Sequence, residues 1–134
     1  MNLDDIKDTF QFLDDWEDKY RFIIDLGRDL PGLSDDQKTD EHIVRGCQSQ
    51  VWLVANVAAD GTLCLAMDSD AHIVRGLISI VLAAFNNKTP EEILATNINA
   101  LFDELKLLEH LSPTRGNGLM AMLQRINSLA SAQV

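Results

Sequence analysis

The chain of 134 residues has few cysteines, a shortage of basic residues and no long apolar run. Its two cysteines, Cys47 and Cys64, are too few for the disulfide framework of a secreted domain and lack the paired spacing of a zinc ribbon. The 11 Lys and Arg residues against 21 Asp and Glu give a net charge of −10, which argues against binding to nucleic acid or to an anionic membrane. The longest apolar stretch, residues 76–85, is about half as long as a bilayer span.

The chain length and the N-terminal residues indicate the number of domains and the cellular compartment. An apolar content of 46% in a chain of this length predicts one domain, residues 1–134, that folds without a disulfide or a metal. The first residues are acidic and contain no apolar run, unlike a signal or transit peptide. With only two thiols, the chain is predicted to be cytoplasmic, with both cysteines reduced.

The acidic charge is concentrated near the N-terminus, where residues 1–41 hold 13 acidic and 5 basic side chains. Apolar positions spaced by three and four predict a helix over residues 16–30, ended by Pro31 and Gly32, with a shorter helix over residues 3–12 before it. Residues 33–41 are polar and are predicted to form a loop. The acidic face of residues 4–29 is either a docking surface for a basic partner or a solvated helix face.

The rest of the chain predicts a β-hairpin followed by helices. Residues 51–57 are β-branched and aromatic, residues 62–67 alternate large and small side chains, and an Asp-Gly pair lies between them. Asp70 is the expected N-cap of an apolar central helix that packs on the hairpin. Further helices are expected after the capping box at residues 89–92, around residues 101–108 and from residue 113 onward. This order predicts an α+β fold in which a small antiparallel sheet is covered by helices.

Cys47 is the most informative residue. It stands among polar residues directly before the first predicted strand, whereas Cys64 lies inside an apolar alternation that is typical of a structural cysteine. Gly46 would permit a positive φ and a close approach of another part of the chain, and Arg45 brings a cation that would lower the pKa of the thiol. The pattern is compatible with a reactive thiol and with a small loop residue of no chemical consequence.

Two other kinds of site could include Cys47: a Cys–His nucleophile pair and a metal site. A Cys–His nucleophile pair would need one of the histidines, His42, His72 or His110, within hydrogen-bond reach of Cys47. A metal site would recruit Cys47, Cys64, Asp70 and His72. Neither has a diagnostic spacing, because the chain contains no CxxC and no HExxH motif.

Residues 46–52 (GCQSQVW) resemble the cysteine motif of the SufE/CsdE family, sulfur acceptors that partner cysteine desulfurases in iron–sulfur cluster assembly. Three further blocks resemble the family: residues 16–27 its N-terminal helix, residues 68–77 its central block and residues 110–119 its C-terminal signature. The four blocks occur in order over nearly the whole chain, which makes the resemblance far more specific than one short motif.

The resemblance implies a fold like that of the IscU-type cluster scaffolds, with Cys47 as the sulfur acceptor on a loop that folds back between encounters. The loop and its supporting residues would be Arg45, Gly46, Gln48, Ser49, Gln50, Asp70 and Arg115. The donor would be a desulfurase of the SufS or CsdA type, which carries the pyridoxal phosphate, so this chain would need no cofactor. Sulfur would pass to a SufBCD-type scaffold or another acceptor. The protein would be an accessory carrier that stimulates the desulfurase and has no turnover of its own, either as a monomer or as a homodimer.

Two rival functions stay open at this point. The first is an iron–sulfur or zinc scaffold that uses Cys47, Cys64, Asp70 and His72. The number of cysteines argues against it, because cluster scaffolds generally bring three cysteines to the site and this chain has two. The second is a passive adaptor that docks through its acidic helix, in which case a Cys47→Ser variant would still stimulate the desulfurase.

Overall fold

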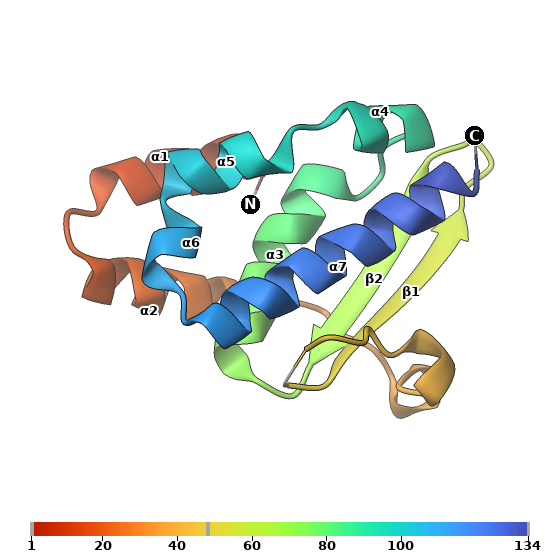
Figure 1. Cartoon of the computed structure of the whole chain (residues 1–134), viewed down its shortest axis with the longest axis horizontal. Coiled ribbons are helices and arrows are strands. Elements are labelled where there is room, and N and C mark those ends of the chain that lie inside the picture. The colour runs from red at the N-terminus through yellow and green to blue at the C-terminus, as the bar shows by residue number, and fades with distance from the viewer. Residues whose placement is uncertain (1, 48, 134) are drawn as a thin grey trace.

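The computed structural model describes residues 2–47 and 49–133. In these residues, seven α-helices and two short 3-10 helices surround one two-stranded antiparallel sheet, which is an α+β fold as predicted (Figure 1). The elements in chain order are α1 (Leu3–Phe12), α2 (Trp16–Arg28), η1 (Asp35–Gln37), η2 (Asp40–His42), β1 (Val51–Val57), β2 (Leu63–Ser69), α3 (His72–Phe85), α4 (Pro90–Ala95), α5 (Ile98–Leu105), α6 (Leu107–His110) and α7 (Pro113–Ser131).

The first two helices begin at side-chain caps. The side chain of Asn2 accepts a hydrogen bond from the Asp5 N–H, and that of Asp15 accepts one from the Asp18 N–H at 2.8 Å. Such caps satisfy backbone donors that a helix start leaves free. Helix α2 ends at Arg28, two residues before the predicted end, and the predicted loop at residues 33–41 contains η1 and the start of η2.

The hairpin pairs β1 with β2 from Val51↔Ser69 to Val57↔Leu63. The Ala58 N–H donates to the Thr62 carbonyl at 2.8 Å, which closes the longer turn that the sequence allows. Strand β2 alternates as predicted, with Leu63, Leu65 and Met67 buried against the core. It continues two residues beyond the predicted end, and this extension brings Asp68 and Ser69 into the sheet.

Helix α3 is buried at the centre of the molecule, as predicted from its two apolar stripes. Helix α2 crosses it at very close range, because neither Gly27 nor Gly76 has a side chain at the crossing point. A Cβ atom built on Gly76 would lie 2.0 Å from the Ile23 carbonyl oxygen, and one on Gly27 would lie 2.7 Å from the Gly76 nitrogen. The two glycines therefore set how closely α2 packs on the core.

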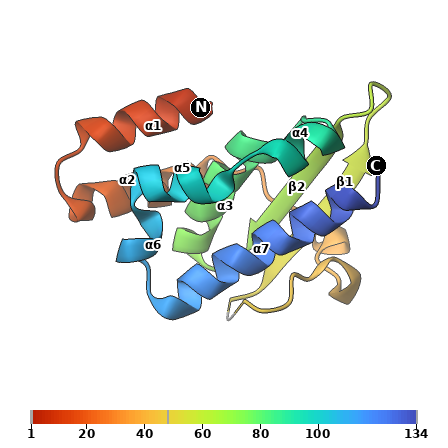
Figure 2. The ribbon, with the colours of Figure 1, turned by 45° about the horizontal axis from the view of Figure 1, so that its top comes forward.

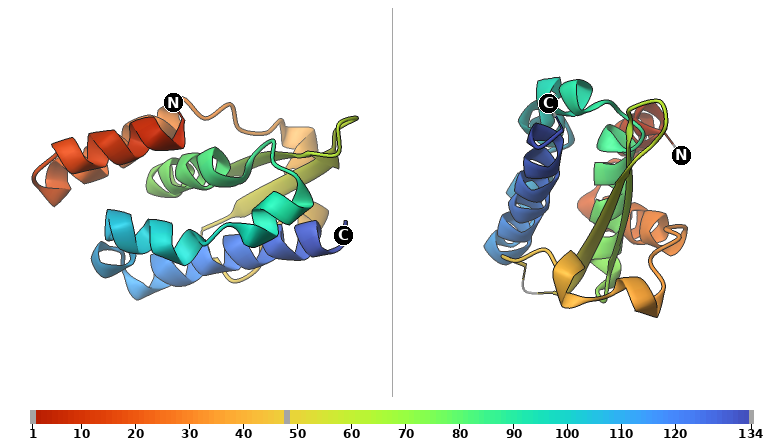
Figure 3. Two further views of the ribbon diagram at one scale, coloured as in Figure 1. Left: turned by 90° about the horizontal axis from the view of Figure 1, so that it is seen from above. Right: turned by 90° about the vertical axis from the view of Figure 1, so that its right-hand side faces the viewer.

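Helices α4, α5 and α7 form a layer over one face of the unit made by the hairpin and α3 (Figures 2 and 3). Helix α7 runs along the hairpin and buries one stripe, which includes Leu119, Met122, Leu123, Ile126 and Ala130. Within residues 2–47 and 49–133, no helix has the length and apolar character needed to cross a bilayer.

The helix predicted around residues 101–108 is interrupted. Lys106 adopts a left-handed conformation with φ of 56°, so that α5 ends at Leu105 and α6 begins at Leu107. The turn places His110 against α2, where its ring stacks on Trp16 with centroids 3.7 Å apart and the Tyr20 hydroxyl donates to its carbonyl. These contacts fix the point from which α7 starts.

Candidate functional site

The segment that carries Cys47, residues 44–50, is here called the cysteine loop, and it is fastened at both ends. The Val44 N–H donates to the Val51 carbonyl at 2.7 Å. At the other end, the Gln50 N–H donates to the Asp70 carboxylate at 3.1 Å, and the Asp70 N–H donates to the Gln50 carbonyl at 3.3 Å. Gln48, which the sequence places among the supporting residues, lies outside the described part of the loop.

Asp70 therefore does not have the role that the sequence predicts. The N-cap of α3 is Ala71, and no side chain in the described residues caps the helix. Because β2 runs on to Ser69, the Asp70 carboxylate is turned toward the cysteine loop and accepts the Gln50 N–H instead. The prediction of a helix cap was wrong, and a contact with the cysteine loop, the less favoured interpretation, is what the structure has.

The thiol of Cys47 points inward against α7. It donates to the Gly118 carbonyl with Sγ and O 3.4 Å apart. Gly46 has a φ of +97°, as predicted for a position that needs glycine, and a Cβ there would lie 3.1 Å from the Ala121 side chain. Gly118 packs directly against the thiol, because a Cβ built on it would lie 3.5 Å from Sγ, an ordinary contact distance. Sequence reasoning missed this contact, although the unusual glycine at residue 118 was visible inside the last predicted helix.

Beside the thiol is a pocket of about 210 Å³. Its floor is apolar and its rim is polar, with contributions from the cysteine loop, β1, α3 and α7. The lining residues are Cys47, Ser49, Val51, Val74, Leu77, Ser112, Thr114, Arg115, Gly118 and Met122. Arg115 lies exposed in the first turn of α7, where its backbone N–H donates to the Ser112 hydroxyl, the N-cap. The structure thus brings Cys47, Ser49 and Arg115 to one pocket.

Burial raises the pKa of the Cys47 thiol above its ordinary value, which favours the protonated form in this conformation. The prediction that Arg45 lowers the pKa was therefore wrong. Arg45 is exposed and lies apart from the pocket, in a second hollow that it shares with Gln124 and Arg125 of α7. Because neither Arg45 nor Arg115 offsets the burial, the thiol is shielded and largely neutral at rest.

The described residues do not assemble the metal site that the sequence left open as an alternative. The Cys64 thiol lies at the opposite end of the hairpin, 3.6 Å from the Asn87 side-chain oxygen, just past the end of α3. The Cys47 pocket is instead lined by Val74 and Leu77 from the first half of that helix. Across residues 2–47 and 49–133, no three His, Cys, Asp or Glu side chains are grouped so that they could hold a metal ion.

A Cys–His pair is not formed either in the part of the chain that the structure describes. The Nδ1 of His42 lies 2.7 Å from the Gln37 carbonyl, and the ring of His110 stacks on Trp16. No described histidine, His72 included, shares a hydrogen bond with Cys47, whose thiol contacts Gly118. The described contacts therefore give the thiol no base.

Comparison with known proteins decides the family. A SufE family model, described as an Fe-S metabolism associated domain, matches residues 4–130. The chain belongs to the SufE family. An uncharacterised SufE-like protein of Rhizobium meliloti (strain 1021) is 47% identical over 136 residues, which cover 99% of this chain and 97% of the relative. Another, from Rhizobium etli, is 47% identical over 135 residues, covering 98% of this chain and 91% of the relative.

A solved structure confirms the fold of this SufE family member. The solution structure of a hypothetical protein from Thermus thermophilus superposes with a TM-score of 0.77 and covers 98% of this chain and 94% of its own. The two sequences are 20% identical, so this likeness concerns the fold alone. The family membership and the α+β fold predicted from sequence are both confirmed, and the family links the protein to Fe–S metabolism.

Proposed function

We propose that this SufE family protein takes sulfur from the persulfide of a cysteine desulfurase onto Cys47 and passes it to an iron–sulfur cluster scaffold. The observation that carries the proposal is the position of the thiol, on a loop anchored at its ends and facing a pocket wide enough for a second sulfur atom. The family's link to Fe–S metabolism supports the same role. The donor is a SufS- or CsdA-type enzyme that supplies the pyridoxal phosphate, and the receiver is a SufBCD-type scaffold or another sulfur acceptor.

The transfer is a thiol exchange in which a sulfur atom is the group that moves. The Cys47 thiolate attacks the outer sulfur of the partner's persulfide in line with the S–S bond. A new S–S bond forms on Cys47 while the old one breaks, and the electron pair of the broken bond leaves on the partner's cysteine sulfur. The moving sulfur keeps its oxidation state, so the step needs no external oxidant or reductant.

The exchange requires the cysteine loop to open. A thiol that rests against the Gly118 carbonyl cannot reach a sulfur atom on another protein, so the Asp70–Gln50 contacts must stretch or break. Opening also removes the burial that raises the pKa of Cys47, so a larger fraction of the thiol is ionised where the partner is present. Reactivity is thus coupled to docking.

The pocket gives the loaded sulfur a place to rest. Its volume of about 210 Å³ exceeds the share of roughly 30 Å³ that one water molecule takes in the liquid, so an outer sulfur fits when the loop closes again. Val74, Leu77 and Met122 line it with apolar surface. A persulfide held there is kept from cytosolic thiols, which would otherwise reduce it.

Arg115 is proposed to favour the anionic sulfur at the mouth of this pocket. It stands in the first turn of α7, where the backbone dipole also favours anions. Arg115→Ala is expected to slow sulfur acceptance or weaken desulfurase binding several-fold, on the order of the 1 kcal/mol of an exposed charge contact. Arg125→Ala is the matched control, because Arg125 lies on the same helix but faces the second hollow. Unchanged rate and affinity for Arg115→Ala would remove Arg115 from the site.

The deciding experiment is mass spectrometry of the chain after incubation with cysteine and one candidate desulfurase at a time. The wild type and a Cys64→Ser variant are expected to gain the mass of one sulfur atom on the Cys47 peptide, whereas Cys47→Ser gains none. Loading confined to Cys64 would overturn the proposal. Full stimulation of the desulfurase by Cys47→Ser would favour the passive adaptor instead.

A further inference from the structure

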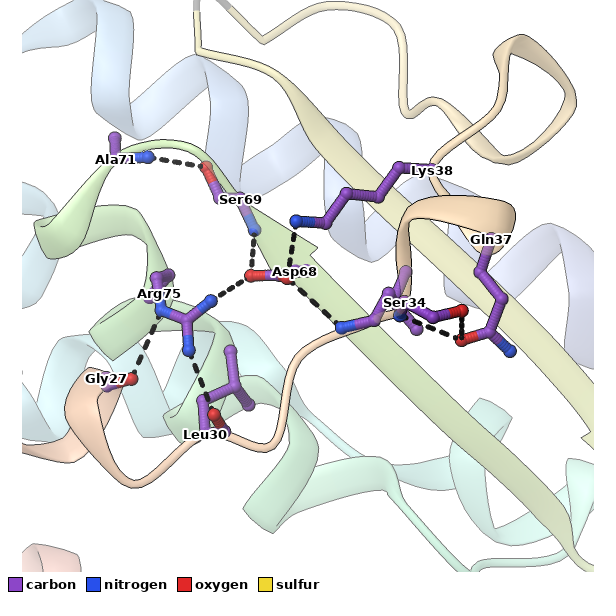
Figure 4. A network of polar contacts seen from close by, with 10 residues as sticks. Gly27, Leu30, Ser34, Gln37, Lys38, Asp68, Ser69, Ala71 and Arg75 are labelled. Atoms are coloured by element: carbon purple, nitrogen blue, oxygen red, sulfur yellow. Dashed lines mark hydrogen bonds and ion pairs between the residues drawn. The ribbon is translucent and has the colours of Figure 1, made fainter.

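Asp68 is a buried carboxylate that the proposed chemistry does not use. It is 3% exposed and lies at the end of β2, where its oxygens face four donors (Figure 4). It accepts the Leu33 N–H at 3.1 Å and the Ser69 N–H at 2.8 Å. It also pairs with the Arg75 guanidinium and, at 3.3 Å, with the Lys38 ammonium. A carboxylate buried at this level stays charged only with such partners.

The partners of Asp68 come from segments far apart in the sequence. Arg75 also donates to the Gly27 carbonyl at 3.3 Å and to the Leu30 carbonyl at 2.9 Å, so it binds the end of α2 to α3 (Figure 4). Gly32 has a φ of +73°, and a Cβ there would lie 2.7 Å from Oδ2 of Asp68. The segment 27–38 thus reaches Asp68 directly at three residues, and at two more through Arg75; the direct contacts are Gly32, Leu33 and Lys38.

The same carboxylate lies next to the anchor of the cysteine loop. Ser69 follows Asp68 and pairs with Val51, the first residue of β1. Asp70, one residue further on, exchanges two hydrogen bonds with Gln50. The Asp68 side chain, which is held by α3 and by the segment that follows α2, accepts the Ser69 N–H. This hydrogen bond fixes the backbone direction at Ser69, and therefore the direction in which Asp70 points toward the loop.

We infer that Asp68 is a positioning residue through which residues 27–38 hold the cysteine loop closed, with the Cys47 thiol against α7. This inference rests on the proposed function, in which closure of the loop protects the sulfur. Replacing the carboxylate by an amide leaves Arg75 and Lys38 with unpaired charges at the end of β2, and it puts an NH2 group where an oxygen accepted either the Leu33 or the Ser69 N–H. The chain then relaxes at Ser69 and Asp70, and the hydrogen bonds to Gln50 weaken.

Cys64 supplies an internal reference for this effect. It lies on the same strand, paired with Asn56 near the other end of the hairpin, and its thiol contacts Asn87. Both cysteines are partly buried. Local opening of the cysteine loop exposes Cys47 alone, whereas general loosening or unfolding exposes both thiols.

The test is the rate of alkylation by iodoacetamide at each cysteine, read by mass spectrometry at neutral pH on the full-length protein. In Asp68→Asn, the Cys47 rate is expected to rise at least about fivefold, the factor that corresponds to one ordinary hydrogen bond, while the Cys64 rate stays within about twofold. Asp60→Asn is the matched control, because Asp60 also holds a backbone N–H and a hydroxyl, both of Thr62, but at the far turn of the hairpin. It should change neither rate.

A second variant tests the contact that Lys38 makes with Asp68. Lys38→Met keeps an unbranched side chain beside the Trp52 ring but removes the ammonium, and it should raise the Cys47 rate alone, by about twofold or more. This variant decides the matter if Asp68→Asn does not fold. Equal acceleration at both cysteines, or none at Cys47, would overturn the inference. Failure of wild-type Cys47 to load sulfur would instead overturn the proposed function, and the alkylation ratio is measured without any desulfurase.

Discussion

The contact between Cys47 and Gly118 gives a paired prediction, because two side chains of different size can be placed at residue 118. A Cβ atom there would lie 3.5 Å from Sγ of Cys47 and 3.8 Å from its Cα and Cβ, all ordinary van der Waals distances. Gly118→Ala should therefore leave the cysteine loop in place. It should raise the free energy of unfolding by about 0.5–1 kcal/mol, the usual gain when alanine replaces glycine inside a helix.

Valine at the same position should behave differently. Its methyl groups extend about 1.5 Å beyond Cβ, and in a helix they are held largely to one rotamer, so they overlap the space of the thiol. Overpacking of this kind costs about 1–3 kcal/mol. Helix α7 is held by a buried stripe, whereas the loop is held by a few hydrogen bonds of about 0.5–1.5 kcal/mol each, so the loop should move.

The assay is alkylation of Cys47 by iodoacetamide, with urea unfolding measured in parallel. Gly118→Val should increase the Cys47 rate at least about fivefold, which corresponds to a shift of about 1 kcal/mol toward the open loop. Gly118→Ala should stay within about twofold of wild type. If the valine variant were alkylated at the wild-type rate while folded, the thiol would not rest against α7, and the described closure of the loop would be refuted.

Contacts elsewhere in the molecule give three more predictions. Asp70→Ala removes one anchor of the cysteine loop and should increase the alkylation rate of Cys47 about threefold or more. The free energy of unfolding in urea should fall by no more than about 1 kcal/mol. An unchanged alkylation rate would contradict the role of Asp70 as an anchor. Burial alone would raise the pKa of Asp68, but its backbone donors and its two cationic partners outweigh this and lower it. The carboxylate therefore adds its full stability above about pH 5, and this is lost as the pH falls past the ordinary carboxyl pKa of about 3.9 and through the lowered one. Urea midpoints measured from about pH 5 downward should fall more steeply for wild type than for Asp68→Asn, and equal slopes would count against the assigned pairs. Gly76→Ala places a Cβ 2.0 Å from the Ile23 carbonyl and should cost more than about 3 kcal/mol or prevent folding, as circular dichroism and urea unfolding would show, whereas Gly61→Ala, in an open turn, should cost less; comparable losses would argue against the tight crossing.

The sequence was sufficient wherever a residue's structure depends on near neighbours. The hairpin, the buried α3 and the positive φ of Gly46 all follow from patterns within a few residues, and the structure has each of them. The placement of Cys47 shortly before a strand also followed from local pattern. The hairpin, α3 and the loop at Gly46 position Cys47, so the place of the candidate site in the fold was predictable.

The features that were missed depend on contacts between distant segments. Asp70 looks like a helix cap because it precedes α3, but β2 continues to Ser69 and turns the carboxylate toward Gln50. The break at Lys106 interrupts a regular leucine spacing and is accompanied by the stacking of His110 on Trp16 of α2, a contact between distant segments. The glycine at residue 118 is visible in the sequence, but its contact with Cys47 and the burial of Asp68 are not, since each depends on a partner far away in the sequence.

The separation of the two thiols along the hairpin has a consequence for damage and repair. Ser69, beside the loop anchor, and Cys64 are five positions apart on β2, or roughly 17 Å at the usual rise of a strand, whereas a disulfide needs Cα atoms within about 7 Å. With two cysteines in all, an oxidised Cys47 has no resolving partner in its own chain. Rescue of a sulfenic acid there by disulfide formation needs a thiol from another molecule, so recovery from peroxide should depend on the concentration of small thiols in the medium.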